Sequence, residues 1–148
     1  MDDANDRLIG ILGLGDPVYA LGARDEWIGW NRQTKKDNLY HVMDAFVLGA
    51  VPPYSYLLGG KLVAMMACSN EVRRAFRRRY SGKKSLIKGK VRPPFLALIT
   101  TASALGRSSI YNRIKIDGHE YWSSVGYSQG SGEFHFSNGV YDDLRAYV

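Results

Sequence analysis

Residues 102–119 carry the densest group of polar side chains in the chain. Those suited to proton transfer or to phosphate binding are Ser103, Arg107, Ser108, Ser109, Tyr111, Asn112 and Arg113. Tyr111 is the candidate general acid, because a phenol with arginines close by in the sequence can protonate a leaving group. Ser103 is a second candidate catalytic residue, and His41 or His119 is the candidate base near neutral pH. The sequence has no Ser-His-Asp pattern, no metal-ligand spacing, no Walker-type loop and no Rossmann fingerprint.

The same polar residues also suit binding without catalysis. Arg107 and Arg113 are predicted nucleic-acid ligands, because arginine donors reach sugar-phosphate backbones. Serine and asparagine after a strand equally form turns and helix caps. The aromatic residues that would stack on unpaired bases are Tyr19, Trp27, Trp30, Tyr54 and Tyr56. Packing in the core or in a hairpin is the alternative for these aromatic residues.

Half of the positive charge lies in residues 73–92, which we call the basic segment. The chain has 20 Lys and Arg against 14 Asp and Glu, a net charge of +6, yet the basic segment holds ten basic residues and no acid. Its predicted nucleic-acid ligands are Arg73, Arg74, Arg77, Arg78, Arg79, Lys83, Lys84, Lys88 and Lys90. Such a block repels itself and favours a polyanionic partner, DNA first and an acidic protein as the alternative. A solvated helix face followed by a basic loop is the third interpretation.

The composition excludes several classes of protein. With 148 residues, 45% hydrophobic and 23% charged, the chain fits one folded domain over residues 1–148. A single cysteine, Cys68, excludes an internal disulfide framework, and one Cys with three His argues against structural zinc. The acidic start lacks the layout of a signal peptide, and no apolar run is long enough for a membrane span. A cytoplasmic location without membrane contact is therefore expected, and the sequence does not identify a cofactor.

Hydrophobic periodicity predicts a mixed α/β domain. The expected order is a strand at 7–14, a hairpin of strands at 18–21 and 27–30, a helix from Asn31 to Val42, a strand at 46–51, a helix at 55–80, a strand at 95–101, a hairpin at 120–127 and 133–136, and a last helix from Asn138. The strands at 46–51 and 95–101 are expected to run in parallel and to splay apart at their carboxyl ends, where ligands favour the crevice.

The predicted helix over 55–80 has one apolar stripe. Its members are Leu58, Leu62, Met65, Met66, Val72, Phe76 and Tyr80, and we expect the two methionines to fill the core. Ser55 is the expected N-cap of this helix. Because Ser55 also follows a strand end, it is the third candidate catalytic residue.

The sequence of strand, backbone turn and long helix resembles the acetyltransferase-like fold. At the junction stand Tyr56-Leu57-Leu58-Gly59-Gly60-Lys61. In acyl-CoA enzymes of that fold, the backbone N–H groups and the helix dipole at this place hold a pyrophosphate. The resemblance implies that Gly59 and Gly60 bind a cofactor. Two neighbouring positions depart from the pattern, because Tyr56 replaces Arg or Gln and Lys61 replaces a small residue.

Several segments resemble the DruA family, which belongs to the Druantia anti-phage defence system. They are the stretch from Gly13 to Trp30, Asp37-Asn38-Leu39-Tyr40-His41-Val42-Met43-Asp44, Leu57-Leu58-Gly59, Ser108-Ser109-Ile110-Tyr111-Asn112-Arg113 and Gly126-Tyr127-Ser128-Gln129-Gly130. The resemblance implies a DNA-directed role in defence or in mobile-element biology. It also implies a distant similarity to the phage Mom DNA-modification proteins, which have the acetyltransferase-like fold. The acidic residue that often follows the buried strand in DruA proteins is missing at residues 100–103.

The sequence thus leaves three functional hypotheses. The first is a nucleic-acid-interacting protein that binds DNA through the basic segment. The second is an enzyme that modifies a DNA base or transfers an acyl group, with Tyr111, Ser103 and Ser55 at its site. The third is a non-enzymatic module that docks an acidic protein.

Overall fold

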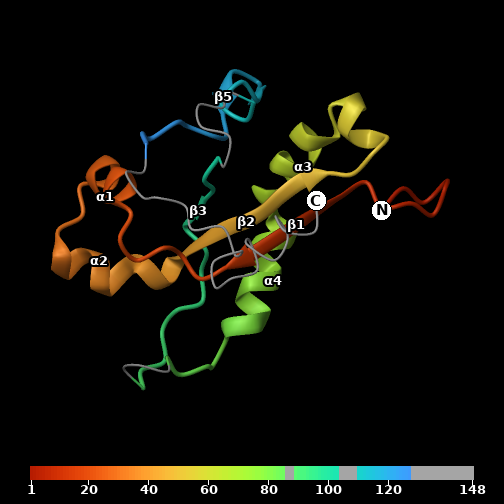
Figure 1. Ribbon diagram of the computed structural model, residues 1–148. Helices are drawn as coiled ribbons and strands as arrows, with labels where there is room; N and C mark the ends of the chain where they lie inside the picture. The colour runs from red at the N-terminus through yellow and green to blue at the C-terminus, as the bar shows by residue number, and fades with distance from the viewer. Residues whose placement is uncertain (86–88, 104–109, 128–148) are drawn as a thin grey trace, which may run out of the picture.

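A computed structural model describes residues 1–85, 89–103 and 110–127, and its central element is a three-stranded sheet (Figure 1). The strands in spatial order are β1 (Gly10–Gly15), β2 (Val42–Ala50) and β3 (Leu98–Thr100). β1 and β2 are antiparallel. β2 and β3 are parallel, as expected for the strands at 46–51 and 95–101. The expected strand at 95–101 is reduced to the three residues of β3. The described part of the chain is therefore mixed α and β.

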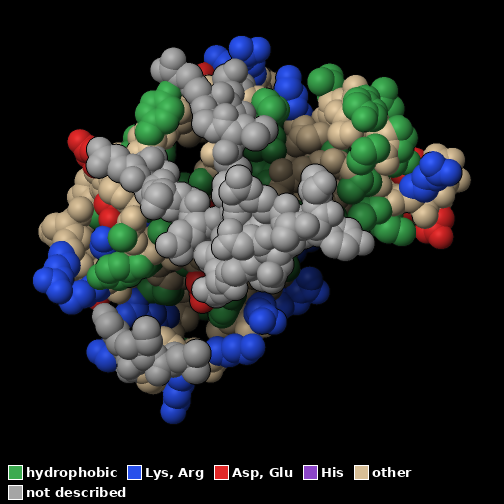
Figure 2. Space-filling view, viewed as in Figure 1, with side chains coloured by type: hydrophobic (Ala, Val, Ile, Leu, Met, Phe, Trp, Pro, Cys, Tyr) green, Lys and Arg blue, Asp and Glu red, His purple; other side chains and the backbone are tan. Residues whose placement is uncertain are grey.

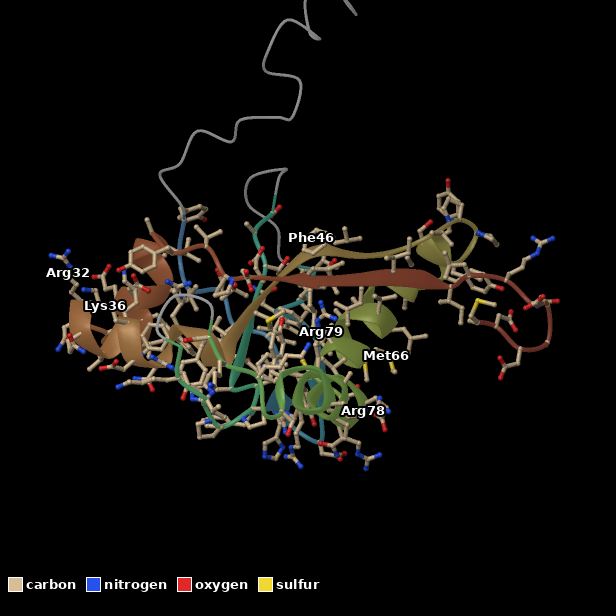
Figure 3. All side chains as sticks on the ribbon, turned by 90° about the horizontal axis from the view of Figure 1, so that it is seen from below. Arg32, Lys36, Phe46, Met66, Arg78 and Arg79 are labelled. Atoms are coloured by element: carbon tan, nitrogen blue, oxygen red, sulfur yellow. The ribbon has the colours of Figure 1, made fainter. Side chains whose placement is uncertain are left out.

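Helices cover one face of this sheet and leave the other face open in the described residues. The helical elements are α1 (Gly22–Ile28), α2 (Arg32–Asn38), α3 (Gly59–Ala67), α4 (Asn70–Tyr80) and the 3₁₀ turns η1 (Leu39–His41) and η2 (Tyr54–Leu57). Figure 3 shows α3 and α4 below β1 and β2, with Phe46 on the opposite side. Phe46 is the extra residue of a β-bulge, and its side chain is 67% exposed.

The core lies between β2, α4 and the segment before β3. Its buried centre consists of Met43, Phe76 and Leu96, with Leu14, Val72, Tyr80 and Ile99 packed around it. α3 approaches β1 closely at Gly10, where an added Cβ would meet Val63 and would lie 2.6 Å from the carbonyl oxygen of Gly49. A larger residue than glycine would therefore push this helix off the sheet.

The predicted hairpin of strands 18–21 and 27–30 is wrong, because this region contains α1. The cause is Arg24, which is 1% exposed. Its guanidinium donates to the carbonyl oxygens of Val18 at 2.7 Å and Tyr19 at 3.3 Å, and to Asp25 Oδ1. A helical turn places Arg24 where the preceding loop wraps around it, and these contacts override the local preference of Trp and Ile for strands.

The helix predicted from Asn31 begins where expected and ends early. Asn31 caps α2: its Oδ1 accepts a hydrogen bond from the Thr34 N–H, and its own N–H donates to Thr34 Oγ1, which completes a capping box. α2 ends at Asn38 instead of Val42. Val42 belongs to β2, where it pairs with Leu98, so strand pairing decides the boundary.

The single helix predicted over 55–80 is wrong, because the chain breaks into η2, α3 and α4. Ser55 is exposed inside η2 and is not an N-cap. The helix stops at Cys68, and the Ser69 side chain accepts a hydrogen bond from the Val72 N–H to start α4. The break changes the direction of the apolar stripe. Leu58, Leu62 and Met66 are 68%, 47% and 49% exposed, so the predicted core role of Met66 is wrong.

The strand predicted at 120–127 is also wrong beyond its first residue. A short hairpin of β4 (Lys115–Ile116) and β5 (His119–Glu120) stands there instead. Its turn is Asp117-Gly118, both with positive φ, the typical sequence for a two-residue hairpin. The partner strand at 133–136, with His135, and the last helix lie outside the described residues.

Candidate nucleic-acid interface

The first half of the basic segment forms the C-terminal part of α4. Ser69 caps the start of the helix, and the chain leaves it at Ser81 and Gly82, as expected. Val72, Phe76 and Tyr80 face the core, with Phe76 8% exposed. These three residues recur every four positions and therefore occupy one narrow side of the helix. All other residues of α4 are exposed.

The five arginines of α4 lie on the side of the helix that faces away from the sheet and on the two flanks of the helix. At about 100° per residue, Arg74, Arg77 and Arg78 lie away from the core-facing side and form what we call the outer arginine face, whereas Arg73 lies on one flank of the helix. The one carboxylate on the helix is Glu71, whose Oε1 lies 3.8 Å from Arg74 in an exposed ion pair. Glu71, Arg74, Arg77 and Arg78 line a shallow depression of about 350 Å³.

Arg79 belongs to the opposite flank of the helix. It is rotated by about 100° from Arg78 and lies next to the core-facing side of the helix, on the flank opposite to that of Arg73. Figure 3 looks along α4 and shows Arg78 and Arg79 leaving it in different directions. The two neighbours are both exposed and carry the same charge, so they form a matched pair for testing which side of the helix binds.

The second half of the basic segment is a loop held by backbone hydrogen bonds. Lys84 and Val91 form an isolated bridge, and the Ser85 N–H donates to the carbonyl oxygen of Lys90 at 3.0 Å. Lys83, Lys84 and Lys90 are exposed, whereas Lys88 lies outside the described residues. Figure 2 shows Lys and Arg side chains over α4 and the loop that follows it, in the lower part of the view.

Arg92 at the end of the basic segment has a structural role. Its Nη1 donates to the carbonyl oxygen of Asp37 at 2.9 Å, and its guanidinium lies 4.2 Å from the centroid of the Tyr40 ring. These contacts tie the basic loop to the end of α2. The positive charge of Arg92 is therefore engaged within the protein.

The two arginines of the polar cluster are not brought to α4. Arg113 is exposed just before β4, and Figure 1 places β4 and β5 at the top of the view and α4 near the bottom. Arg107 lies outside the described residues, as do Ser108 and Ser109. The structure therefore separates Arg113 from the basic segment.

The three candidate catalytic residues lie in different surroundings. Tyr111 is partly buried; its hydroxyl donates to the carbonyl oxygen of Leu48 at 3.0 Å, and its ring lies against Trp122. Trp122 in turn donates to the carbonyl oxygen of Ala64 at 3.1 Å, so this pair fastens residues 110–122 to β2 and α3. Ser103 is exposed after β3, and Ser55 is exposed in η2. Their catalytic roles stay predictions.

The two candidate cofactor glycines differ sharply. A Cβ at Gly59 would lie 2.5 Å from the carbonyl oxygen of Tyr54 and 3.0 Å from the Ala50 Cβ, so Gly59 is needed for close packing. A Cβ at Gly60 would meet nothing within 4 Å. α3 starts after Leu58, which has a positive φ and gives no side-chain cap. Cofactor binding by Gly59 and Gly60 stays a prediction.

His41, one of the two candidate bases, is a core residue. It is 6% exposed, its Nδ1 lies 2.9 Å from the carbonyl oxygen of Phe95, and its ring stacks on that of Phe95. Burial lowers the pKa of His41 below its usual value, against the hydrogen bond to Phe95, and the charge of Arg92 lowers it further. His41 is therefore neutral at pH 7 and shielded from substrate. His119 is exposed in β5, with Nδ1 3.0 Å from the Asp117 carbonyl oxygen.

Sequence reasoning missed an ionic network beneath α1 and α2. Asp25 Oδ1 accepts from Arg24, and Asp25 Oδ2 accepts from Lys35 Nζ at 2.8 Å. Lys35 lies 4.6 Å from the Tyr19 ring centroid, so one candidate stacking residue already has a partner within the protein. The sequence held a signal for the helix that carries this network. Gly29 follows Asp25 by four residues, and an Arg-Asp pair at that distance from a glycine is as compatible with a helix end as with a hairpin turn.

A family model and a curated relative each match all or nearly all of this chain. The family model described as Druantia protein DruA matches residues 1–148. The curated protein named Druantia protein DruA from Escherichia coli (strain UMEA 4076-1) is 44% identical over 147 residues, which make up 99% of this chain and 36% of that protein. The chain thus spans about a third of the length of this curated relative.

No solved structure matches the chain. Within residues 1–85, 89–103 and 110–127, no helix is long and apolar enough to cross a membrane, and no group of three or more His, Cys, Asp or Glu could hold a metal ion. A match of the family model over the full length, together with 44% identity to a curated member, shows that the chain belongs to the DruA family.

Proposed function

We propose that this protein binds DNA through the basic segment and acts in anti-phage defence. The observation that carries the binding part is the surface of α4. Five arginines are exposed on an eleven-residue helix whose one carboxylate is Glu71, itself in an exposed pair. Within the described residues, the α4 arginines other than Arg74 have no carboxylate partner, so they repel one another, and a row of phosphates relieves that repulsion. The defence part rests on membership of the DruA family.

We also propose that the chain has an acetyltransferase-like fold. β2, η2 and α3 stand in the order of strand, backbone turn and helix, which supports an acetyltransferase-like architecture and, with it, the distant similarity to the Mom DNA-modification proteins. An acyl-type cofactor would lie at the start of α3, where the Gly60 backbone has open space beside it. No step of the proposed binding function needs that cofactor.

The test is fluorescence anisotropy with labelled duplex and single-stranded DNA at about 50 and 200 mM salt. With ~4 phosphate contacts, the plot of log affinity against log salt has a slope of roughly −3 to −4. The variant Arg79→Ala/Lys83→Ala removes two exposed charges of the basic segment and is expected to make the slope shallower by roughly 2.

The matched control is Arg32→Ala/Lys36→Ala, which also removes two exposed positive charges. Arg32 and Lys36 lie on α2, at the left of Figure 3, whereas Arg78 and Arg79 of α4 lie near its centre. The control is expected to keep the affinity and the slope of the unmodified protein. Equal losses in both double variants would contradict a specific role of the basic segment. Absence of DNA binding, with capture by an acidic protein instead, would replace DNA by a protein partner.

A further inference from the structure

The shape of the outer arginine face points to the form of nucleic acid that it fits. An α-helix with its side chains is about 10–12 Å across, and the major groove of B-form DNA is about 12 Å wide. α4 has one narrow side on the core, and its remaining surface is exposed. A helix supported from behind and free on its outer side can enter such a groove, whereas a flat basic surface can only follow the backbone.

We infer that α4 enters the major groove of double-stranded DNA with the outer arginine face directed at the base edges; this inference rests on the proposed DNA binding. Arg74 and Arg78 are four residues apart, which is about 6 Å along the helix. That length corresponds to roughly two base-pair steps. Forked guanidinium groups suit the paired acceptors of guanine in this groove.

The rest of the basic segment would contact the groove walls. Two groups of basic residues are close in sequence to the outer arginine face. They are Arg79 on the flank of α4 and the exposed Lys83, Lys84 and Lys90 of the following loop. Residues placed beside an inserted helix meet phosphates, which fix position and add affinity without reading sequence. The inference therefore assigns different roles to Arg78 and Arg79, although both are exposed and charged.

Glu71 is consistent with this orientation. It lies on the outer side of α4, 3.8 Å from Arg74, in the same depression as Arg77 and Arg78. A carboxylate on a surface that only follows phosphates weakens binding, whereas one among base edges can accept from the amino group of cytosine. Its presence on the binding side favours contact with bases over contact with the backbone alone.

The first experiment compares three labelled duplexes of one sequence by anisotropy with the intact chain. They are plain DNA, DNA whose cytosines carry glucosylated hydroxymethyl groups in the major groove, and RNA, whose major groove is too deep and narrow for a side chain to read. Blocking the groove is expected to weaken binding about tenfold or more, and the RNA duplex is expected to bind as weakly. Netropsin, which fills the minor groove of plain DNA, is expected to leave the affinity within about twofold.

The second experiment compares Arg78→Ala with Arg79→Ala, and adds Arg78→Lys. Arg79→Ala removes a phosphate contact and is expected to lower the magnitude of the salt slope by about 1, whereas Arg78→Ala removes a base contact and is expected to change the slope less. Arg78→Ala and Arg78→Lys are expected to reduce discrimination between DNA sequences, because lysine lacks the planar fork, whereas Arg79→Ala lowers all affinities uniformly. Circular dichroism and the thermal midpoint verify that each variant is folded.

The outcomes separate this inference from the proposed function. Equal affinity for plain and glucosylated DNA, with the salt slope intact, overturns groove insertion and leaves DNA binding in place. Tighter binding to single strands than to duplex overturns groove insertion as well. Loss of binding to every nucleic acid at low salt overturns both.

Discussion

Arg24 and Asp25, adjacent in the sequence, form a two-bond ion pair in which Asp25 Oδ1 accepts from Nε at 2.9 Å and from Nη2 at 2.6 Å. Arg24 is 1% exposed, so its charge depends on Asp25 for neutralisation. Removing one partner of a buried pair leaves the other charged and unpaired. We expect Asp25→Asn to lower the free energy of unfolding by about 3 kcal/mol, measured by urea denaturation. Lys35→Met serves as the control and is expected to cost less, because Asp25 keeps both hydrogen bonds from Arg24.

The same carboxylate predicts acid sensitivity. Burial raises the pKa of Asp25, but hydrogen bonds from Lys35 and Arg24 and their positive charges outweigh burial and hold the pKa below its usual value of 3.8. Because the unfolded chain binds the proton at higher pH than the folded chain, this contribution to stability is present above pH 3.8 and is lost as pH falls through the folded pKa. Denaturation midpoints measured from pH 5 downward should fall more steeply for the unmodified protein than for Asp25→Asn.

His41 predicts a second pH-dependent interval at higher pH. Its folded pKa lies below the usual 6.5, chiefly through burial, so the unfolded chain takes up the proton first. Stability is therefore expected to decline as pH falls from 6.5 through the folded pKa. His41→Phe keeps an aromatic ring against Phe95, removes the titrating group and should flatten this interval. It also removes the bond to the Phe95 carbonyl, at a cost of about 1 kcal/mol. Identical pH profiles for the two proteins would show that His41 does not titrate there.

Gly59 and Gly60 predict opposite effects of one substitution. Gly59→Ala forces a methyl group against the Tyr54 carbonyl oxygen and is expected to destabilise the protein by about 1–3 kcal/mol. Gly60→Ala points into open space within α3 and is expected to stabilise it by up to about 1 kcal/mol. Thermal midpoints of the two variants distinguish these signs. A destabilised Gly60→Ala would indicate a constraint at the start of α3 that packing does not explain.

Tyr111→Phe separates the structural role of this tyrosine from the catalytic one. Losing the hydroxyl leaves the Leu48 carbonyl oxygen without this donor, and we expect a loss of about 1 kcal/mol in unfolding free energy. DNA affinity measured by anisotropy should stay within about twofold, because Tyr111 is not part of the basic segment. If the variant is folded and binds DNA but has lost an activity that the unmodified protein shows, Tyr111 is catalytic as first predicted.

Local signals in the sequence were enough to predict some elements. Asn31 and the Ser81-Gly82 stop mark real helix ends, because capping and glycine turns depend on neighbours within four residues. The exposure of the α4 arginines follows from their charge, and the apolar spacing of Val72, Phe76 and Tyr80 fixes which side they leave free. The candidate interface was therefore predictable at the level of a helix and its orientation.

Other features depend on contacts that a local pattern does not contain. α1 exists because Arg24 is buried among carbonyl oxygens and its partner Asp25 also binds Lys35, ten residues further along. The break at Cys68 reorients α3, so a stripe that is continuous on one straight helix no longer reaches the core at Met66. In both cases tertiary packing overrides a periodic pattern that was read correctly.

The turn before β1 and the basic loop carry charge of opposite sign. Asp3 and Asp6 are exposed in the turn before β1, and the basic loop lies at the opposite corner of Figure 1. In the part of the chain that the structure describes, this separation contributes an electric dipole to the molecule. A polyanion that approaches it exerts a torque that brings the arginines forward and the acidic turn to the rear before contact. Electrostatic orientation of this kind speeds encounter far more than it prolongs residence, so ionic strength should act mainly on the association rate constant.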